Sequence, residues 1–152
     1  MMREPAHDTW ILIADGEKAL FLRNEGDAEY PVFQVERIEE QDNPPARDQA
    51  ANRPGRFHDG PSVQRSAVQD TDWHLLEKER FAHDMAGILY RMAHRGRFDR
   101  LILAASPRVL GELRHDLHQE VTSRIVGEIP KTLTNHPVDE IETRVKADLR
   151  AA

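Results

Sequence analysis

The sequence predicts a single α/β domain in which one mixed, five-stranded sheet is flanked by helices. Its 152 residues are enough for one hydrophobic core and too few for two comfortable domains. The first forty residues hold three apolar segments separated by short turn signals, a pattern typical of an antiparallel meander. Beyond residue 72, helical and strand patterns alternate, and strands that are joined through helices usually pair in parallel.

The first two strands are predicted over residues 10–15 and 17–24, with the sequences WILIAD and EKALFLRN. The first is dominated by large apolar and β-branched residues, which favour strands. Asp15-Gly16, where the two segments meet, is a residue pair that tight hairpin turns prefer, because both residues tolerate a positive φ. We therefore expect an antiparallel hairpin.

The third strand is predicted over residues 32–40, VFQVERIEE, after the turn signal NEGDAEYP. Strict alternation places Phe33 and Val35 on one face of this strand and Val32 and Ile38 on the other. This segment completes the meander.

A long connection without a clear helical or strand period is predicted at about residues 41–71. Residues 41–70 hold four of the nine prolines and few large apolar side chains that could bury a face. Connections of this length inside a compact domain are uncommon and are either functional loops or tethers. We expect this loop to be mobile.

The clearest helix is predicted from Asp72, a suitable N-cap, to Gly96, a suitable stop. Its apolar residues recur at spacings of three and four, as expected for one buried face: Leu75, Ala82, Met85, Leu89, and Met92 or Ala93.

Two further strands and two further helices follow. The strands are predicted over residues 99–105 and 124–129, and the helix between them over 108–120, with Ser106-Pro107 as its cap and first turn. Pro137 opens the last helix, whose apolar stripe consists of Val138, Ile141, Val145 and Leu149.

Composition describes an ordinary soluble protein, with 39% hydrophobic and 32% charged residues. The absence of cysteine excludes disulfides, thiolate nucleophiles and cysteine-ligated metal sites. The only apolar run near the N-terminus, WILIA, is too short for a signal sequence or a membrane span. We therefore expect a cytoplasmic protein that does not insert into membranes.

Charge is unevenly distributed along the chain. The formal net charge is −6, and residues 1–40 hold four Lys or Arg against ten acids, whereas residues 91–124 hold seven Arg against four acids. Such a chain binds nucleic acid poorly in a non-specific way, but a local basic face can meet RNA or another anion. The alternative for these arginines is a solvated, charged surface.

No Walker loop, GxGxxG, GxSxG or HExxH motif is present, so we expect no cofactor and no catalytic residue. His115 with His118, and Glu79 with His83, have helical spacing but are commonly just surface residues, and we expect no metal site. Ser106 follows a predicted strand and precedes a predicted helix, and such a helix start favours the binding of an anion. In the alternative interpretation, Ser106 is only the N-cap of that helix.

Several segments resemble the bacterial host attachment protein family over nearly the whole chain: WILIADGEKALFLR, RPGRF, LLEKERFAHDMAGIL, GRFDRLILAASPRVLGELR and VGEIPKTLTNHPVDEIETRV. The most specific parts are FDRLILAASPRVLGELR and IPKTLTNHP. That family looks like a bacterial relative of the middle domain of archaeal and eukaryotic class-one peptide release factors. The resemblance implies a mixed sheet flanked by helices, in agreement with the order of elements predicted above.

In release factors, the connection after the third strand carries a Gly-Gly-Gln tip that promotes peptidyl-tRNA hydrolysis. Residues 53–65, RPGRFHDGPSVQR, are its positional counterpart by this resemblance, yet no Gly-Gly-Gln occurs in the chain. We therefore do not transfer the catalytic role. We instead interpret the loop as a mobile basic segment that contacts phosphate. The alternative is a flexible loop exposed to solvent. The residues predicted to contact an anion or RNA are Arg53, Arg56, His58, Gln64, Arg65, Ser106 and Arg108.

These observations predict a non-enzymatic, cytosolic binding module whose partner is the ribosome, a tRNA or another RNA. The family name implies one alternative, a protein–protein interaction factor that supports bacterial attachment to host cells. The other alternative is a hydrolase that uses Ser106 or the histidines.

Overall fold

The computed structural model describes the backbone of residues 4–41 and 60–151, and the side chains of residues 4–41 and 73–151. Five strands form one sheet in the order β3-β2-β1-β4-β5. β1 (Trp10–Ala14), β2 (Lys18–Asn24) and β3 (Phe33–Glu40) pair antiparallel. β4 (Leu101–Ala104) pairs in parallel with β1 and with β5 (Ile125–Ile129). The predicted single α/β domain with a mixed, five-stranded sheet is confirmed.

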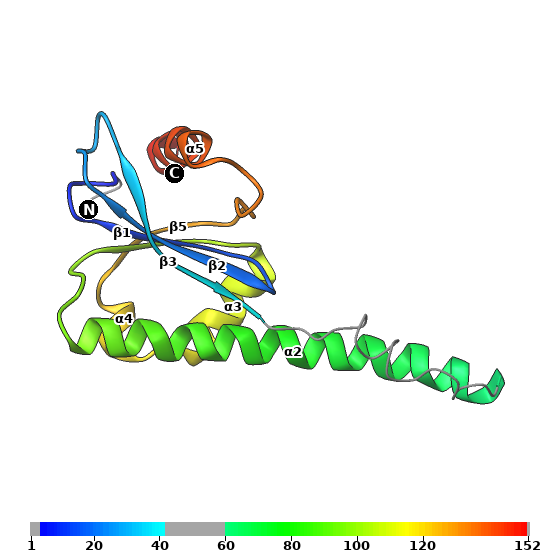
Figure 1. Cartoon of the computed structure of the whole chain (residues 1–152). Helices are drawn as coiled ribbons and strands as arrows, with labels where there is room; N and C mark the ends of the chain where they lie inside the picture. Colours follow the sequence, from blue (N-terminus) through cyan, green and yellow to red (C-terminus); the bar gives the residue numbers. More distant parts are fainter. Residues whose placement is uncertain (1–3, 42–59, 152) are drawn as a thin grey trace.

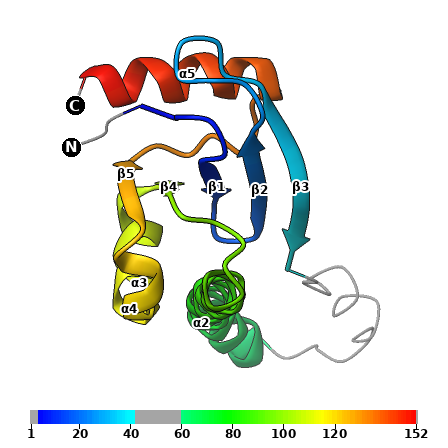
Figure 2. The same cartoon turned by 90° about the vertical axis from the view of Figure 1, so that its left-hand side faces the viewer.

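Helices cover both faces of the sheet (Figures 1 and 2). α2 (Gly60–His94), α3 (Pro107–Asp116) and α4 (Gln119–Thr122) lie on one face, and α5 (Val138–Ala151) lies on the other. Each face has its own buried cluster: Leu12, Phe21 and Leu103 meet Met85 and Leu89 on the α2 face, and Ile13, Leu22 and Ile102 meet Ile141 and Val145 on the α5 face. Because both faces are covered, β1 and β4 are apolar throughout.

The predicted hairpin at Asp15-Gly16 is confirmed, although neither residue adopts the positive φ that both tolerate. One carboxylate oxygen of Asp15, Oδ1, accepts hydrogen bonds from the backbone N–H groups of Glu17 and Lys18, both at 2.7 Å. Its other oxygen accepts a hydrogen bond of 2.7 Å from the hydroxyl of Thr134, a residue of the segment between β5 and α5. One side chain therefore closes the turn and also ties it to a distant part of the chain.

The face assignment predicted for the third strand is confirmed for Phe33 and Val35, which share a face, but it is wrong for Ile38, because β3 contains an irregularity. Phe21 pairs with Arg37 but Leu22 pairs with Val35, so Glu36 is an extra residue of a β-bulge. The bulge brings Ile38, opposite Leu20, onto the same face as Val35. It also places Glu36 and Arg37 together on the α2 face, where both line a hollow.

The long helix begins earlier than predicted. α2 starts at Gly60 rather than at Asp72, and it ends at His94, close to the predicted stop at Gly96. Proline suits the first turn of a helix, where its missing N–H has no intrahelical partner, so Gly60-Pro61 is a start signal. Residues 60–71 of the predicted loop are thus helical, and residues 42–59 lie outside the described residues. The mobility expected of the loop stays a prediction.

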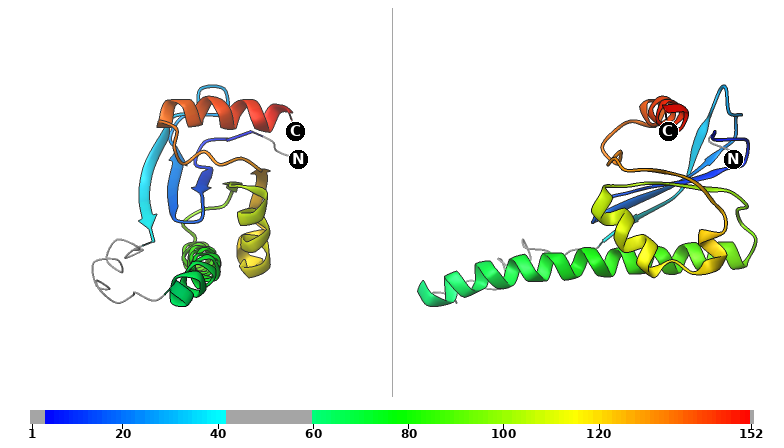
Figure 3. Two further views of the ribbon diagram at one scale, coloured as in Figure 1. Left: turned by 90° about the vertical axis from the view of Figure 1, so that its right-hand side faces the viewer. Right: turned by 180° about the vertical axis from the view of Figure 1, so that it is seen from behind.

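The N-terminal part of α2 runs beyond the sheet (Figures 1 and 3). Among the side chains described from residue 73 onward, the first buried residue of α2 is Phe81, and Leu76 is exposed. None of the described helices is long and apolar enough to cross a membrane.

The helix predicted over residues 108–120 is divided in two. α3 ends at Asp116, Leu117 is extended, and α4 starts after His118. The imidazole Nδ1 of His118 accepts a hydrogen bond of 3.0 Å from the N–H of Glu120 and so caps α4. Leu117 packs against the buried cluster of the α2 face, which favours the break.

Candidate functional site

The end of α2 holds three arginines in a fixed arrangement. Gly96 has a φ of 71°, which is the left-handed conformation of a helix C-cap. Its N–H donates to the carbonyl of Ala93, and the N–H of Arg97 donates to the carbonyl of Met92, both at 2.9 Å. These two bonds form a Schellman motif. The motif reverses the chain after Arg95, so that Arg95 and Arg97 flank the glycine while Arg91 lies in the last turn of the helix.

These arginines border a depression that we call the β3–α2 groove. It consists of two adjoining hollows of about 370 and 310 Å³, which share Ile88 and Arg91. The first hollow is also lined by Glu39, Glu40, Gln41, Phe81, His83, Asp84, Met85 and Gly87. The second is also lined by Trp10, Glu36, Arg37, Met92, Arg95 and Arg97.

Three of the groove arginines have no protein partner among the described residues. Arg91, Arg95 and Arg97 are exposed and form no ion pair or side-chain hydrogen bond with any described residue. Every other arginine whose side chain the structure describes donates a hydrogen bond to a carboxylate or a carbonyl, or, for Arg37, forms an ion pair: Arg23, Arg37, Arg80, Arg100, Arg108, Arg114, Arg124, Arg144 and Arg150. A cation in the last turn of a helix interacts favourably with the helix dipole. This interaction explains the position of Arg91, but not the positions of Arg95 and Arg97.

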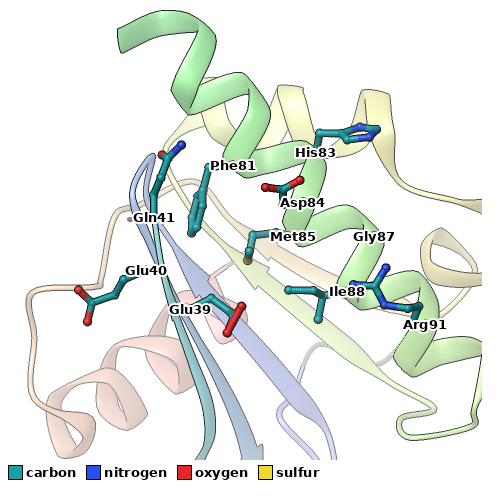
Figure 4. Close-up of a pocket in the computed structure, with 10 residues that line it drawn as sticks. All are labelled: Glu39, Glu40, Gln41, Phe81, His83, Asp84, Met85, Gly87, Ile88 and Arg91. Carbon is teal, nitrogen blue, oxygen red and sulfur yellow. The ribbon is translucent and has the colours of Figure 1, made fainter. Parts of the chain in front are cut away.

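The other end of the groove is acidic (Figure 4). Glu39 of β3 and Asp84 of α2 point toward the space between the two elements, whereas Glu40 and His83 point away from it. Glu39 pairs with Arg37 at 3.4 Å. Asp84 is exposed and forms no ion pair with any described residue. The groove therefore has an arginine end and an acidic end.

The floor between the two ends is apolar. Phe81, Met85, Ile88 and Trp10 are each at least nine-tenths buried and belong to the cluster of the α2 face. These side chains pack between the sheet and α2. Guanidinium groups bind phosphate or carboxylate oxygens in a bidentate way, and carboxylates accept hydrogen bonds from amino groups. The groove can therefore bind a ligand with an anionic end and an amino end.

Ser106 is the N-cap of α3, which is one of the two roles predicted for it. Its hydroxyl accepts a hydrogen bond of 3.3 Å from the N–H of Val109, and Pro107 occupies the first turn. Arg108 pairs through Nε with Glu112 at 3.3 Å on the same helix. An anion at this helix start would have to compete with Glu112 for the guanidinium group, so the anion site predicted at Ser106 and Arg108 stays a prediction with little geometric support.

The described histidines make no contact with Ser106 that would suggest a catalytic pair. Within the described ranges, no hydrogen bond or ion pair joins Ser106 to a histidine, so the hydrolase alternative gains nothing from the structure. His115 contacts Asp116, His118 caps α4, and His83 contacts Asp116 rather than Glu79. No group of three His, Asp or Glu side chains among the described residues could hold a metal ion.

The predicted loop contacts cannot be placed as side chains. Arg53, Arg56 and His58 lie outside the described residues. Gln64 and Arg65 are described only as helical backbone, in the first turns of α2. All five stay predictions.

Sequence reasoning missed Arg37, Arg91, Arg95 and Arg97 as members of one site. A signal was present in the seven arginines of residues 91–124. Which of them lie together depends on where β3 and α2 are placed, and that information is not local in sequence.

Comparison with known proteins agrees with the release-factor relationship. No curated protein matches the chain. The model of one family, bacterial archaeo-eukaryotic release factor family 12, matches residues 8–145, which include every described strand and nearly all of the described helical residues. The predicted relationship to release factors is thus confirmed, whereas the resemblance to host attachment proteins stays a prediction. The chain belongs to the bacterial archaeo-eukaryotic release factor family 12.

Proposed function

We propose that this protein is a non-enzymatic RNA-binding module that acts on the ribosome, a tRNA or another RNA of translation. One observation carries the proposal: the arginines that lack a protein partner among the described residues, Arg91, Arg95 and Arg97, all border one groove. In a chain with a net charge of −6, most described arginines are neutralised by nearby acids. Among the described residues, no acid neutralises the three at the groove, which supports the binding of an external anion.

RNA phosphate is the anion that suits this arrangement best. An extended groove with several separate guanidinium groups matches a chain of phosphates better than one small anion, because each group can meet a different phosphate. Membership of a release-factor family supports RNA of translation as the partner.

The test is sedimentation of the purified protein with ribosomes at low and moderate salt. The double variant Arg91→Glu with Arg95→Glu should no longer pellet, because charge reversal replaces attraction to phosphate by repulsion. The matched control is Arg80→Glu with Arg144→Glu, which changes the net charge equally at ion pairs outside the groove. Pelleting of the groove variant at the level of the wild type would contradict the proposal.

A protein partner is the second candidate, and one observation favours it. Large apolar residues are exposed on and just before the edge strand β3: Tyr30, Val32, Val35 and Ile38. Exposed apolar patches on a sheet edge are typical of protein contacts. If Val35→Asp with Ile38→Asp abolishes pelleting with ribosomes while the groove variant retains it, the partner is a protein and not RNA.

A further inference from the structure

The proposed function leaves open what the acidic end of the β3–α2 groove does. A groove that served only to attract phosphate would gain nothing from Glu39 and Asp84, since both carboxylates repel an anion. Glu39 is partly neutralised by Arg37, at 3.4 Å. Asp84 has no such partner among the described residues, and it points toward the space between β3 and α2 (Figure 4).

The two ends share lining residues, and the side chains beneath them are apolar. Ile88 and Arg91 line both hollows, so a ligand can extend from the arginines to the carboxylates without leaving the groove. Phe81 and Met85 form the floor of the acidic hollow and are almost completely buried.

A nucleotide of single-stranded RNA has the same three parts in the same order. Its phosphate is anionic, its base is a flat apolar surface, and the edge of the base carries hydrogen-bonding groups. A carboxylate accepts hydrogen bonds but cannot donate them, so it discriminates in favour of a base with an amino group. Cytosine presents such an amino group at the position where uracil presents a carbonyl oxygen.

We infer that the β3–α2 groove binds single-stranded RNA through one nucleotide whose phosphate meets Arg91 and Arg95 and whose base presents its amino group to Asp84. This inference rests on the proposed function and deepens it from RNA in general to single-stranded RNA with an amino-bearing base. Asp84 and Glu39 give the selectivity, and the arginines give most of the affinity.

The experiment measures the affinity of the purified protein for six-residue oligocytidine and oligouridine by fluorescence anisotropy. The wild type should bind oligocytidine more tightly by about fivefold or more, the effect of one good hydrogen-bonded contact to a base edge. Asp84→Asn should make the two affinities nearly equal, because an amide can donate to the uracil oxygen as well as accept from the cytosine amino group.

Glu79→Gln is the matched control, because Glu79 is an exposed carboxylate on the same helix that lines neither hollow. This variant should keep the preference of the wild type. Thermal unfolding of each variant checks that the fold is intact.

Equal binding of the two oligomers by the wild type would overturn the inference, as would a cytidine preference that survives Asp84→Asn. With either result, the proposed function would hold, provided that the double variant Arg91→Glu with Arg95→Glu does not pellet with ribosomes. If the wild type bound neither oligomer and did not pellet with ribosomes, the proposed function itself would be overturned.

Discussion

The side-chain amide of Gln41 donates from Nε2 to two oxygens of Glu77, to the backbone carbonyl at 3.1 Å and to carboxylate Oε2 at 2.7 Å. Gln41 directly follows β3, and Glu77 lies in α2 before the first described buried residue of that helix, Phe81. The pair therefore joins the edge strand to α2 beside the acidic end of the β3–α2 groove, which Gln41 also lines.

Gln41→Ala should lower the free energy of unfolding by about 1 kcal/mol, the usual net value of a partly buried hydrogen bond. Chemical denaturation measures this change. Gln34→Ala is the control, because Gln34 is exposed on the same strand and its side chain makes no hydrogen bond with any described residue. Equal losses in the two variants would show that the contact between Gln41 and Glu77 contributes nothing.

At two glycines, substitution by alanine measures the free-energy cost of the backbone conformation alone, because the added methyl group makes no new contact. An added methyl group would meet no atom within 4 Å at Gly96 or at Gly111. Gly96 has a φ of 71°, so Gly96→Ala should destabilise the protein by about 1–2 kcal/mol. Gly111 lies inside α3, where Gly111→Ala should stabilise it by about 0.5–1 kcal/mol. Thermal unfolding of both variants checks the opposite signs, and a Gly96→Ala variant at least as stable as the wild type would contradict the left-handed cap.

The carboxylate of Glu29 is held to α5 by a charge-assisted hydrogen bond. Arg150 lies 2.7 Å from Oε2 of Glu29, and this bond, together with the charge of Lys146, lowers the pKa of Glu29. A lowered pKa in the folded state means that the stabilisation is present above the unfolded-state pKa and is lost as the pH falls through the folded-state value.

Arg150→Gln should therefore raise the pKa of Glu29 toward its ordinary value, as followed by NMR titration of the side-chain carboxyl carbon. The internal control is Glu140, whose pKa is lowered mainly by a hydrogen bond from Arg144 and should not change. An unchanged Glu29 pKa in the variant would show that the contact with Arg150 is not formed in solution.

The protein should not release peptide from peptidyl-tRNA. The chain lacks a Gly-Gly-Gln tripeptide, and its nearest counterpart, from Gly60 to Gln64, is helical backbone at the start of α2. Pro61 also fixes φ next to Gly60, so this segment cannot adopt a paired-glycine turn without unwinding. Ribosomes carrying peptidyl-tRNA provide the assay, with Gln64→Ala for comparison. Release by the wild type that is lost in Gln64→Ala would require an enzymatic function instead.

Local signals were sufficient for most of the fold. Asp15-Gly16 predicted the hairpin, Ser106-Pro107 predicted the start of α3, and Gly96 predicted the end of α2, because each reflects backbone geometry that a few residues determine. The start of α2 was missed for a physical reason. Helical periodicity in a sequence arises from a buried face, and described burial in α2 begins only at Phe81, so the part that extends past the sheet gives little periodic signal.

The sequence alone does not predict the groove. The bulge that puts Glu36 and Arg37 on the α2 face is one extra residue, which simple alternation does not reveal. Arg37 and Arg91 come from elements far apart in the chain, and only the packing of α2 beside β3 brings them to the same hollow.

Ultraviolet cross-linking of ribosomal RNA to the protein, followed by mass spectrometry of the peptides, tests whether RNA binds in the β3–α2 groove. Cross-links are expected in residues 84–97 and 36–41, which form the walls of the groove. These cross-links should disappear in Arg91→Glu with Arg95→Glu and persist in Arg80→Glu with Arg144→Glu. Cross-links confined to residues 53–65, or spread over α5 on the opposite face, would contradict binding in the groove.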